Sequence, residues 1–97
     1  MNLSDLRREI DGVDERLIPL FIERMALSDR VAAYKRENGL PTQSAAREAE
    51  ILSSVRARAG EEYGSYAEAL YQTILALSRA RQDEVNARQE NPADGNS

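Results

Sequence analysis

Apolar residues recur every three or four positions along the first third of the chain, which is the spacing of one face of an α-helix. From Leu3 to Tyr34 this repeat keeps heptad phase, and nine of its ten positions are apolar. We call these ten positions the seam: Leu3, Leu6, Ile10, Val13, Leu17, Leu20, Arg24, Leu27, Val31 and Tyr34. The pattern predicts one very long amphipathic helix.

The sequence also carries start and stop signals for this helix. Asn2 or Ser4 can serve as its N-cap, and Asn38-Gly39 followed by Pro41 is a typical end, so we predict a helix that runs to about Asn38. Such a helix is about 54 Å long, whereas a compact chain of this size has a radius of gyration of about 12–13 Å. It cannot bury the seam against its own chain, so we predict an obligate dimer or higher oligomer, with this helix at its centre.

Two residues inside the predicted helix disfavour helical backbone. Gly12 costs up to about 1 kcal/mol, and Pro19 costs about 3 kcal/mol or more, because it lacks an N–H and crowds the carbonyl of Glu15. Since the heptad stays in phase across these positions, we expect a kink between Glu15 and Pro19. A break into two helices is the alternative.

Helical periodicity continues in the rest of the chain, and nothing alternates with period two over a useful length. A second helix is predicted from the N-cap Ser44 to about Ala59, before Gly60. A third opens with a capping box at residues 65–68 and continues to about Arg88. The predicted fold class is therefore all-α, with three helices per chain.

The overall composition fits one small folded domain. Of the 97 residues, 41% are hydrophobic, which suits a helical domain at 1–90, whereas the stretch 91–97 is rich in Asn, Asp, Gly and Pro and is expected to be disordered. No apolar run approaches the roughly 20 residues of a membrane span, and no charged-then-apolar leader opens the chain. We therefore expect a cytoplasmic protein without a membrane partner. The net charge of −4 argues against nucleic acid, which needs a basic surface.

The sequence contains neither histidine nor cysteine. It therefore lacks the commonest metal ligand, the usual base at neutral pH and any thiolate site. No metal is expected, and any catalysis has to work by positioning and electrostatics, or by carboxylate chemistry.

Arg24 is the one charged residue in the seam. Because a buried charge without a partner is costly, this guanidinium is expected to have an anionic partner or a route to water. Lys35 lies eleven residues later, within about 20° of three full turns, so both cations share one helix face. Arg7 lies about 100° away from that face, and in a dimer paired through these helices it could reach the neighbour's pocket instead. An internal salt bridge or a snorkelling side chain is the alternative reading of Arg24.

Polar residues also interrupt the apolar stripes of the other two predicted helices. Glu48 occupies the first turn of the second helix, and Ser78 and Gln82 end the stripe of the third. Each of the three alone fits a boundary position at a helix end. Together with Arg24 and Lys35 they describe a cationic pocket between helices, suited to a small dianion that carries a hydroxyl.

In their order and spacing these residues resemble the all-helical family of chorismate mutases, which form an intertwined helical homodimer. The matching positions are Leu6-Arg7-Arg8-Glu9-Ile10-Asp11, Val13-Asp14, Arg24, Lys35, Pro41, Arg47-Glu48, Ser78 and Gln82. The match covers about residues 3 to 85. The resemblance implies the pericyclic rearrangement of chorismate to prephenate, in phenylalanine and tyrosine biosynthesis, without metal, cofactor or covalent intermediate.

The resemblance also implies roles for the cations. Arg24 and the partner's Arg7 would grip the two carboxylates of the substrate. Lys35 and Gln82 would donate to its ether oxygen, where negative charge grows as the C–O bond breaks. Preorganised donors at such a position are typically worth a few kcal/mol each.

The remaining implied contacts concern the ring hydroxyl and a carboxylate. Glu48 would accept a hydrogen bond from the ring hydroxyl, helped by the backbone at Ser44, and Ser78 would contact a carboxylate. The family often has an aspartate where this chain has Ser44, so only the backbone or cap role is expected there. Arg47 matches the family, with a structural role in orienting Glu48 as the alternative.

Two rival functions stay open at this point. Isochorismate pyruvate lyases of the same fold cleave isochorismate to salicylate and pyruvate, but they lack the acid equivalent to Glu48 and carry a bulkier residue at the Ser78 position. The second rival is a helical dimerisation module without catalysis. In that case Arg24→Ala would change stability or dimerisation and abolish no small-molecule binding.

Overall fold

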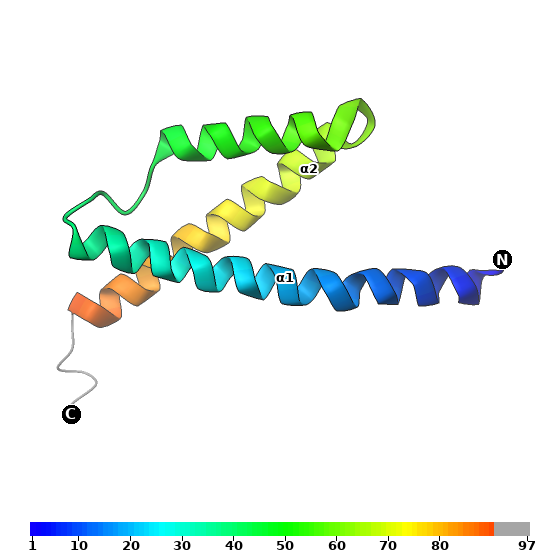
Figure 1. Ribbon diagram of the computed structural model, residues 1–97, viewed down its shortest axis with the longest axis horizontal. Helices are drawn as coiled ribbons and strands as arrows, with labels where there is room; N and C mark the ends of the chain where they lie inside the picture. Colours follow the sequence, from blue (N-terminus) through cyan, green and yellow to red (C-terminus); the bar gives the residue numbers. More distant parts are fainter. Residues whose placement is uncertain (91–97) are drawn as a thin grey trace.

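The computed structural model describes residues 1–90, and that part of the chain is helical with no strand. It contains two helices, α1 (Leu3–Glu37) and α2 (Ala45–Glu90), joined by a loop at residues 38–44 (Figure 1). At Gly60 the backbone of α2 is not helical, and the chain turns back there. We call residues 45–59 the N-arm and residues 61–90 the C-arm. The all-α prediction is confirmed, and the tail predicted at 91–97 lies outside the described residues.

Both predicted ends of the first helix are confirmed. Asn2 is the N-cap: its side chain accepts a hydrogen bond from the backbone N–H of Asp5 at 2.9 Å, and Asp5 accepts one from the Asn2 N–H at 3.3 Å. The helix stops at the C-cap Asn38, followed by Gly39 with a φ of 66°. Between these caps α1 runs through Pro19 without a break, so the two-helix alternative is wrong. The kink stays a prediction.

The prediction of three helices is wrong, because the structure has two. Gly60 ends the N-arm as expected, with φ 84° and ψ 176°, a conformation that is essentially restricted to glycine. The residues after it return to helical backbone, so Ser65, predicted as the cap of a third helix, lies inside the C-arm. The arms also approach closely, because a Cβ added at the buried Gly64 would lie 3.1 Å from the carbonyl oxygen of Arg56.

Because only glycine adopts this backbone readily, Gly60→Ala is expected to lower the free energy of unfolding by about 1–3 kcal/mol. Ser54→Ala, at an exposed helical position of the N-arm, is the matched control and should have little effect. Thermal unfolding of both variants at one fixed protein concentration measures the difference. Equal midpoints would show that the turn tolerates a side chain.

The core within this chain is small and lies where the C-terminal half of α1 meets the C-arm. Ala32 and Leu75, 2% and 6% exposed, are its buried apolar residues in the described part. An ion pair joins the same two elements: Arg81 donates to the Asp29 carboxylate with contacts of 3.1–3.3 Å. The hydrogen bond and the charge of Asp29 raise the pKa of Arg81 above its ordinary high value, so this guanidinium stays charged.

The N-terminal half of α1 extends away from the rest of the chain (Figure 1). Its seam residues Leu3, Ile10 and Leu20 are 58–60% exposed. The molecule measures 58 × 33 × 16 Å, with a radius of gyration of 17.6 Å that lies well above the value for a compact chain. The seam is therefore not buried by its own chain, as predicted. Neither helix in residues 1–90 contains a stretch apolar enough to cross a membrane.

Candidate active site

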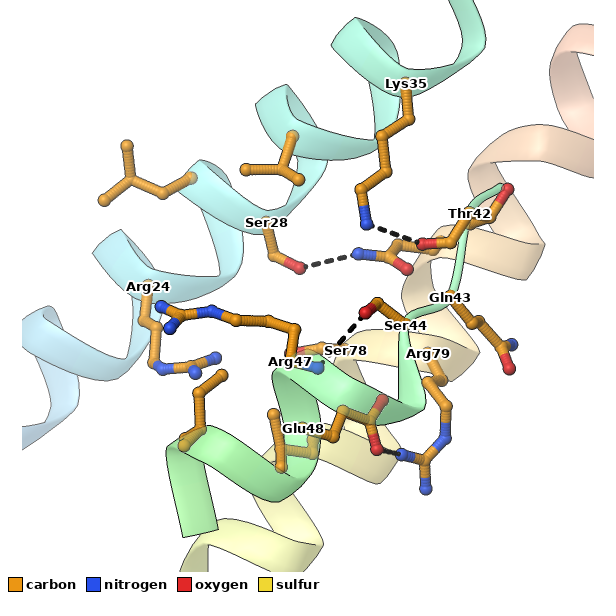
Figure 2. A pocket seen from close by; sticks show the side chains of 15 residues that line it. Arg24, Ser28, Lys35, Thr42, Gln43, Ser44, Arg47, Glu48, Ser78 and Arg79 are labelled. Carbon is orange, nitrogen blue, oxygen red and sulfur yellow. Dashed lines mark hydrogen bonds and ion pairs between the residues drawn. The ribbon is translucent and has the colours of Figure 1, made fainter. Parts of the chain in front are cut away.

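A cavity of about 330 Å³ lies among the second half of α1, the loop, the start of the N-arm and the C-arm (Figure 2). Seven of the eight predicted site residues line it, namely Arg24, Lys35, Ser44, Arg47, Glu48, Ser78 and Gln82. They come from segments up to 58 residues apart, as Arg24 and Gln82 show. The fold thus brings together in one place the polar residues that the sequence separates.

Arg7 is the predicted site residue that does not line this cavity. It is exposed on the N-terminal part of α1. Seventeen residues of helix separate it from Arg24, which is about 25 Å along the axis. Within one chain Arg7 therefore does not reach the cavity, in agreement with the helix geometry predicted above.

Arg24 reaches the cavity from α1 and is half-buried. Its guanidinium carbon lies 5.6 Å from the ring centroid of Tyr71 on the C-arm, a cation–π distance. Among residues 1–88, whose side chains the structure describes, no carboxylate forms an ion pair with Arg24, so the internal salt bridge considered above is not present there. The aromatic face supports the cation without neutralising it.

Lys35 of α1 and Gln82 of the C-arm both face the cavity. The Lys35 ammonium donates to the backbone carbonyl of Thr42 at 3.2 Å, as Figure 2 shows, and the Gln82 amide donates to the Ser28 hydroxyl at 3.0 Å. An ammonium has three N–H bonds and an amide has two. Each group therefore keeps donor capacity for an acceptor in the cavity.

The loop that holds Lys35 is itself fixed to the C-arm. Asn86 donates to the Thr42 hydroxyl at 3.4 Å and accepts a hydrogen bond from Arg36 at 2.9 Å. These contacts connect α1, the loop and the C-arm at the edge of the cavity. They limit where the Thr42 carbonyl, and with it the Lys35 ammonium, can lie.

Glu48 forms an ion pair with Arg79 of the C-arm (Figure 2). Arg47 pairs with Glu50 at 2.6 Å, and its alternative role in orienting Glu48 stays a prediction. The backbone N–H of Arg47 donates to the Ser44 hydroxyl at 3.1 Å, which confirms the cap role of Ser44.

Comparison with known proteins decides the family. Residues 6–83, more than three quarters of the chain, match the profile of the family described as chorismate mutase type II. The chain belongs to this family.

Its relatives are mostly longer proteins. The chain is 36% identical over 77 residues to the T-protein of Haemophilus influenzae, which covers 79% of this chain and 20% of that protein. It is 37% identical over 62 residues to the bifunctional chorismate mutase/prephenate dehydratase of Aquifex aeolicus, covering 64% and 17%. A chorismate mutase of Methanocaldococcus jannaschii is 33% identical over 54 residues, covering 56% and 54%. The chain thus spans about a fifth of the first two relatives and about half of the third.

No solved structure gives a significant match to this type II chorismate mutase family member. The site is therefore described from the geometry of this chain alone.

Some residues of the cavity in this chorismate mutase family member were missed by the sequence analysis. Ser28 lies one turn after Arg24 and two turns before Lys35, so helical spacing could have placed it on the same face. Arg79 directly follows Ser78, but its pairing with Glu48 depends on how the arms pack. The contribution of Thr42 is a backbone carbonyl, which no side-chain pattern reveals.

The charges of this cavity suit an anionic ligand. Four cationic side chains and one carboxylate line it: Arg24, Lys35, Arg47, Arg79 and Glu48. Arg47 and Arg79 have carboxylate partners, whereas Arg24 and Lys35 form no ion pair within residues 1–88. The site is locally positive although the whole chain carries a formal charge of −4.

Proposed function

We propose that this chain catalyses the rearrangement of chorismate to prephenate, the step that leads toward phenylalanine and tyrosine. One observation carries the proposal: Arg24, Lys35 and Gln82 line a single cavity, and the two cations have no carboxylate partner in the described part of the chain. Membership of the chorismate mutase type II family supports the same reaction.

The reaction needs no proton transfer and no covalent intermediate. In a single step the ether C–O bond breaks while a new C–C bond forms, and negative charge grows on the ether oxygen. Lys35 and Gln82 are the donors for that oxygen, and each keeps N–H bonds free for it. Because this charge is larger in the transition state than in the substrate, these donors lower the barrier rather than only tighten binding.

Arg24 binds one substrate carboxylate in this proposal. Its fork of N–H donors suits a bidentate grip, which holds the substrate in the compact conformer that reacts. Ser78, which is 6% exposed, contacts a carboxylate, and Glu48 accepts from the ring hydroxyl.

We also propose that the working molecule is a homodimer in which α1 pairs with the partner's α1 in antiparallel fashion. A two-fold axis at Glu15 matches seam positions with one another, and the resulting pairs are Leu3 with Leu27, Leu6 with Arg24, Ile10 with Leu20, and Val13 with Leu17. In three of these four pairs both residues are apolar, so this register covers most of the exposed half of the seam with apolar residues. It also brings the partner's Arg7 beside Arg24, where it binds the second carboxylate.

Engineered cysteines test this register, because the chain has none of its own. The double variant Ile10→Cys/Leu20→Cys is expected to form disulfide-linked dimers under mild oxidation, since the two positions face each other across the proposed axis. In the control Leu20→Cys alone, the two cysteines lie about 15 Å apart along the helices and should not link. Non-reducing gel electrophoresis gives the answer, and equal linking of both variants would contradict the register.

The reaction itself is tested by following the loss of chorismate absorbance and the formation of prephenate with purified wild-type protein. Isochorismate is offered as a second substrate. Prephenate formation supports the mutase, whereas salicylate from isochorismate with chorismate untouched would identify a lyase. A folded dimer that converts neither would leave the non-catalytic module as the remaining function. The cytoplasmic location stays a prediction.

A further inference from the structure

Arg79 contacts the carboxylate of Glu48, which is assigned to the ring hydroxyl of the substrate. Arg79 itself has no role in the proposed reaction. The ion pair between Arg79 and Glu48 joins the two arms of α2 and is partly shielded, with side chains 36% and 27% exposed. The backbone of Arg79 is well anchored, because Ser78 and Leu75 beside it are each 6% exposed. The backbone that carries Arg79 is therefore held in place, and its guanidinium lies on the wall of the cavity, paired with Glu48.

Glu48 has competing partners in the same cavity. Lys35 and Arg24 also line it, and neither forms an ion pair with a carboxylate of residues 1–88. A carboxylate that swung toward either of them would neutralise a group needed for the anionic substrate. The contact with Arg79 holds the Glu48 carboxylate against the C-arm, away from Lys35 and Arg24 on α1, and removes this competition.

The same contact leaves Glu48 able to accept another hydrogen bond. A carboxylate offers about four lone-pair sites on two oxygens, and the contact with Arg79 uses one oxygen, Oε1. The other oxygen is free to accept from a hydroxyl of the ligand. A fixed carboxylate with one open oxygen distinguishes a ring that carries a hydroxyl at this place from one that lacks it.

We propose that Arg79 is a positioning residue, which fixes the Glu48 carboxylate toward the ring hydroxyl of the substrate and keeps it from pairing with Lys35 and Arg24. This inference rests on the proposed chorismate mutase function. It assigns Arg79 no contact with the substrate, so its whole effect passes through Glu48.

The test compares Arg79→Gln, Glu48→Gln and the double variant by their kcat/KM for chorismate. Arg79→Gln is expected to lower kcat/KM by about tenfold to a hundredfold, the usual range for a charge-assisted hydrogen bond. In the Glu48→Gln background the same change should have less than a twofold effect, because the group it positions is gone. Arg79→Lys should recover most of the loss, since an ammonium can also hold the carboxylate.

The matched control is Arg56→Gln, which removes the other ion pair between the arms, Arg56 with Glu68, outside the cavity. It should leave kcat/KM unchanged, and circular dichroism should show equal helix content in all variants. If the wild type is active and Arg79→Gln has the same kcat/KM, the role of Arg79 is wrong and the proposed function is unaffected. An equal loss in the presence and absence of Glu48 would show the same. A wild type that does not convert chorismate overturns the proposed function, and this inference with it.

Discussion

Replacement of Lys35 by alanine is expected to lower kcat/KM for chorismate by about 10²–10³-fold, with helix content and dimerisation unchanged. The Lys35 ammonium is half-buried, faces the cavity and is held by the Thr42 carbonyl, so it meets a developing charge without reorganising. Alanine removes the donor and leaves α1 intact, because alanine favours the helix. The assay follows chorismate absorbance and prephenate formation, with circular dichroism as the check on folding.

Two further variants make this result specific. Gln82→Ala removes the second donor to the ether oxygen and should also reduce kcat more than it raises KM. Arg30→Ala removes a cation from an exposed position of the same helix and should leave the rate unchanged. A Lys35→Ala variant that keeps wild-type kcat would show that charge at the ether oxygen is stabilised by other groups.

Mixing two inactive variants is expected to restore about a quarter of the wild-type activity, if each site is built from two chains. Arg7→Ala and Arg24→Ala should each lose about 10²-fold or more, because each removes a grip on a substrate carboxylate. After joint unfolding and refolding, half of the dimers contain one chain of each kind. In each of these, one site combines an intact Arg24 with the partner's intact Arg7, and the other site lacks both.

Arg8→Ala is the matched control for this experiment. Arg8 follows Arg7 directly, is exposed and lies 3.8 Å from the Asp5 carboxylate, so its loss should not affect activity. Mixed dimers that form but stay inactive would contradict the shared site. An Arg7→Ala variant with wild-type activity would show that the second carboxylate is bound by this chain alone.

Much of α1 could be predicted from the sequence because its determinants are local. Caps such as Asn2 and Asn38 act through backbone groups only a few residues away, and the heptad identifies the apolar face of the helix directly. The shared face of Arg24 and Lys35 follows from 3.6 residues per turn. The exposure of the seam followed from comparing the length of the helix with the size of a compact chain.

The features that the sequence did not predict are contacts between segments far apart in the chain. The sequence predicted that Gly60 ends the second helix. It did not reveal that this one residue suffices to reverse the chain, or that the helix resumes directly after it without a cap at Ser65. The Glu48–Arg79 pair joins residues 31 positions apart, and its formation depends on the angle between the arms. Sequence spacing could suggest only Arg47, a direct neighbour of Glu48, as a residue that orients it, and gave no sign of this distant partner.

The turn at Gly60 also affects the thermodynamics of ligand binding. A connection of one residue lets the two arms diverge far less than a flexible loop would, and the ion pair between Arg79 and Glu48 crosses between them at the cavity. The cavity wall with Glu48 and the wall with Gln82 are thus held at a set separation before any ligand arrives. The walls are ordered when the chain folds, and the conformational entropy is lost at that stage. Substrate binding therefore does not have to order them, which leaves more of the interaction free energy for affinity.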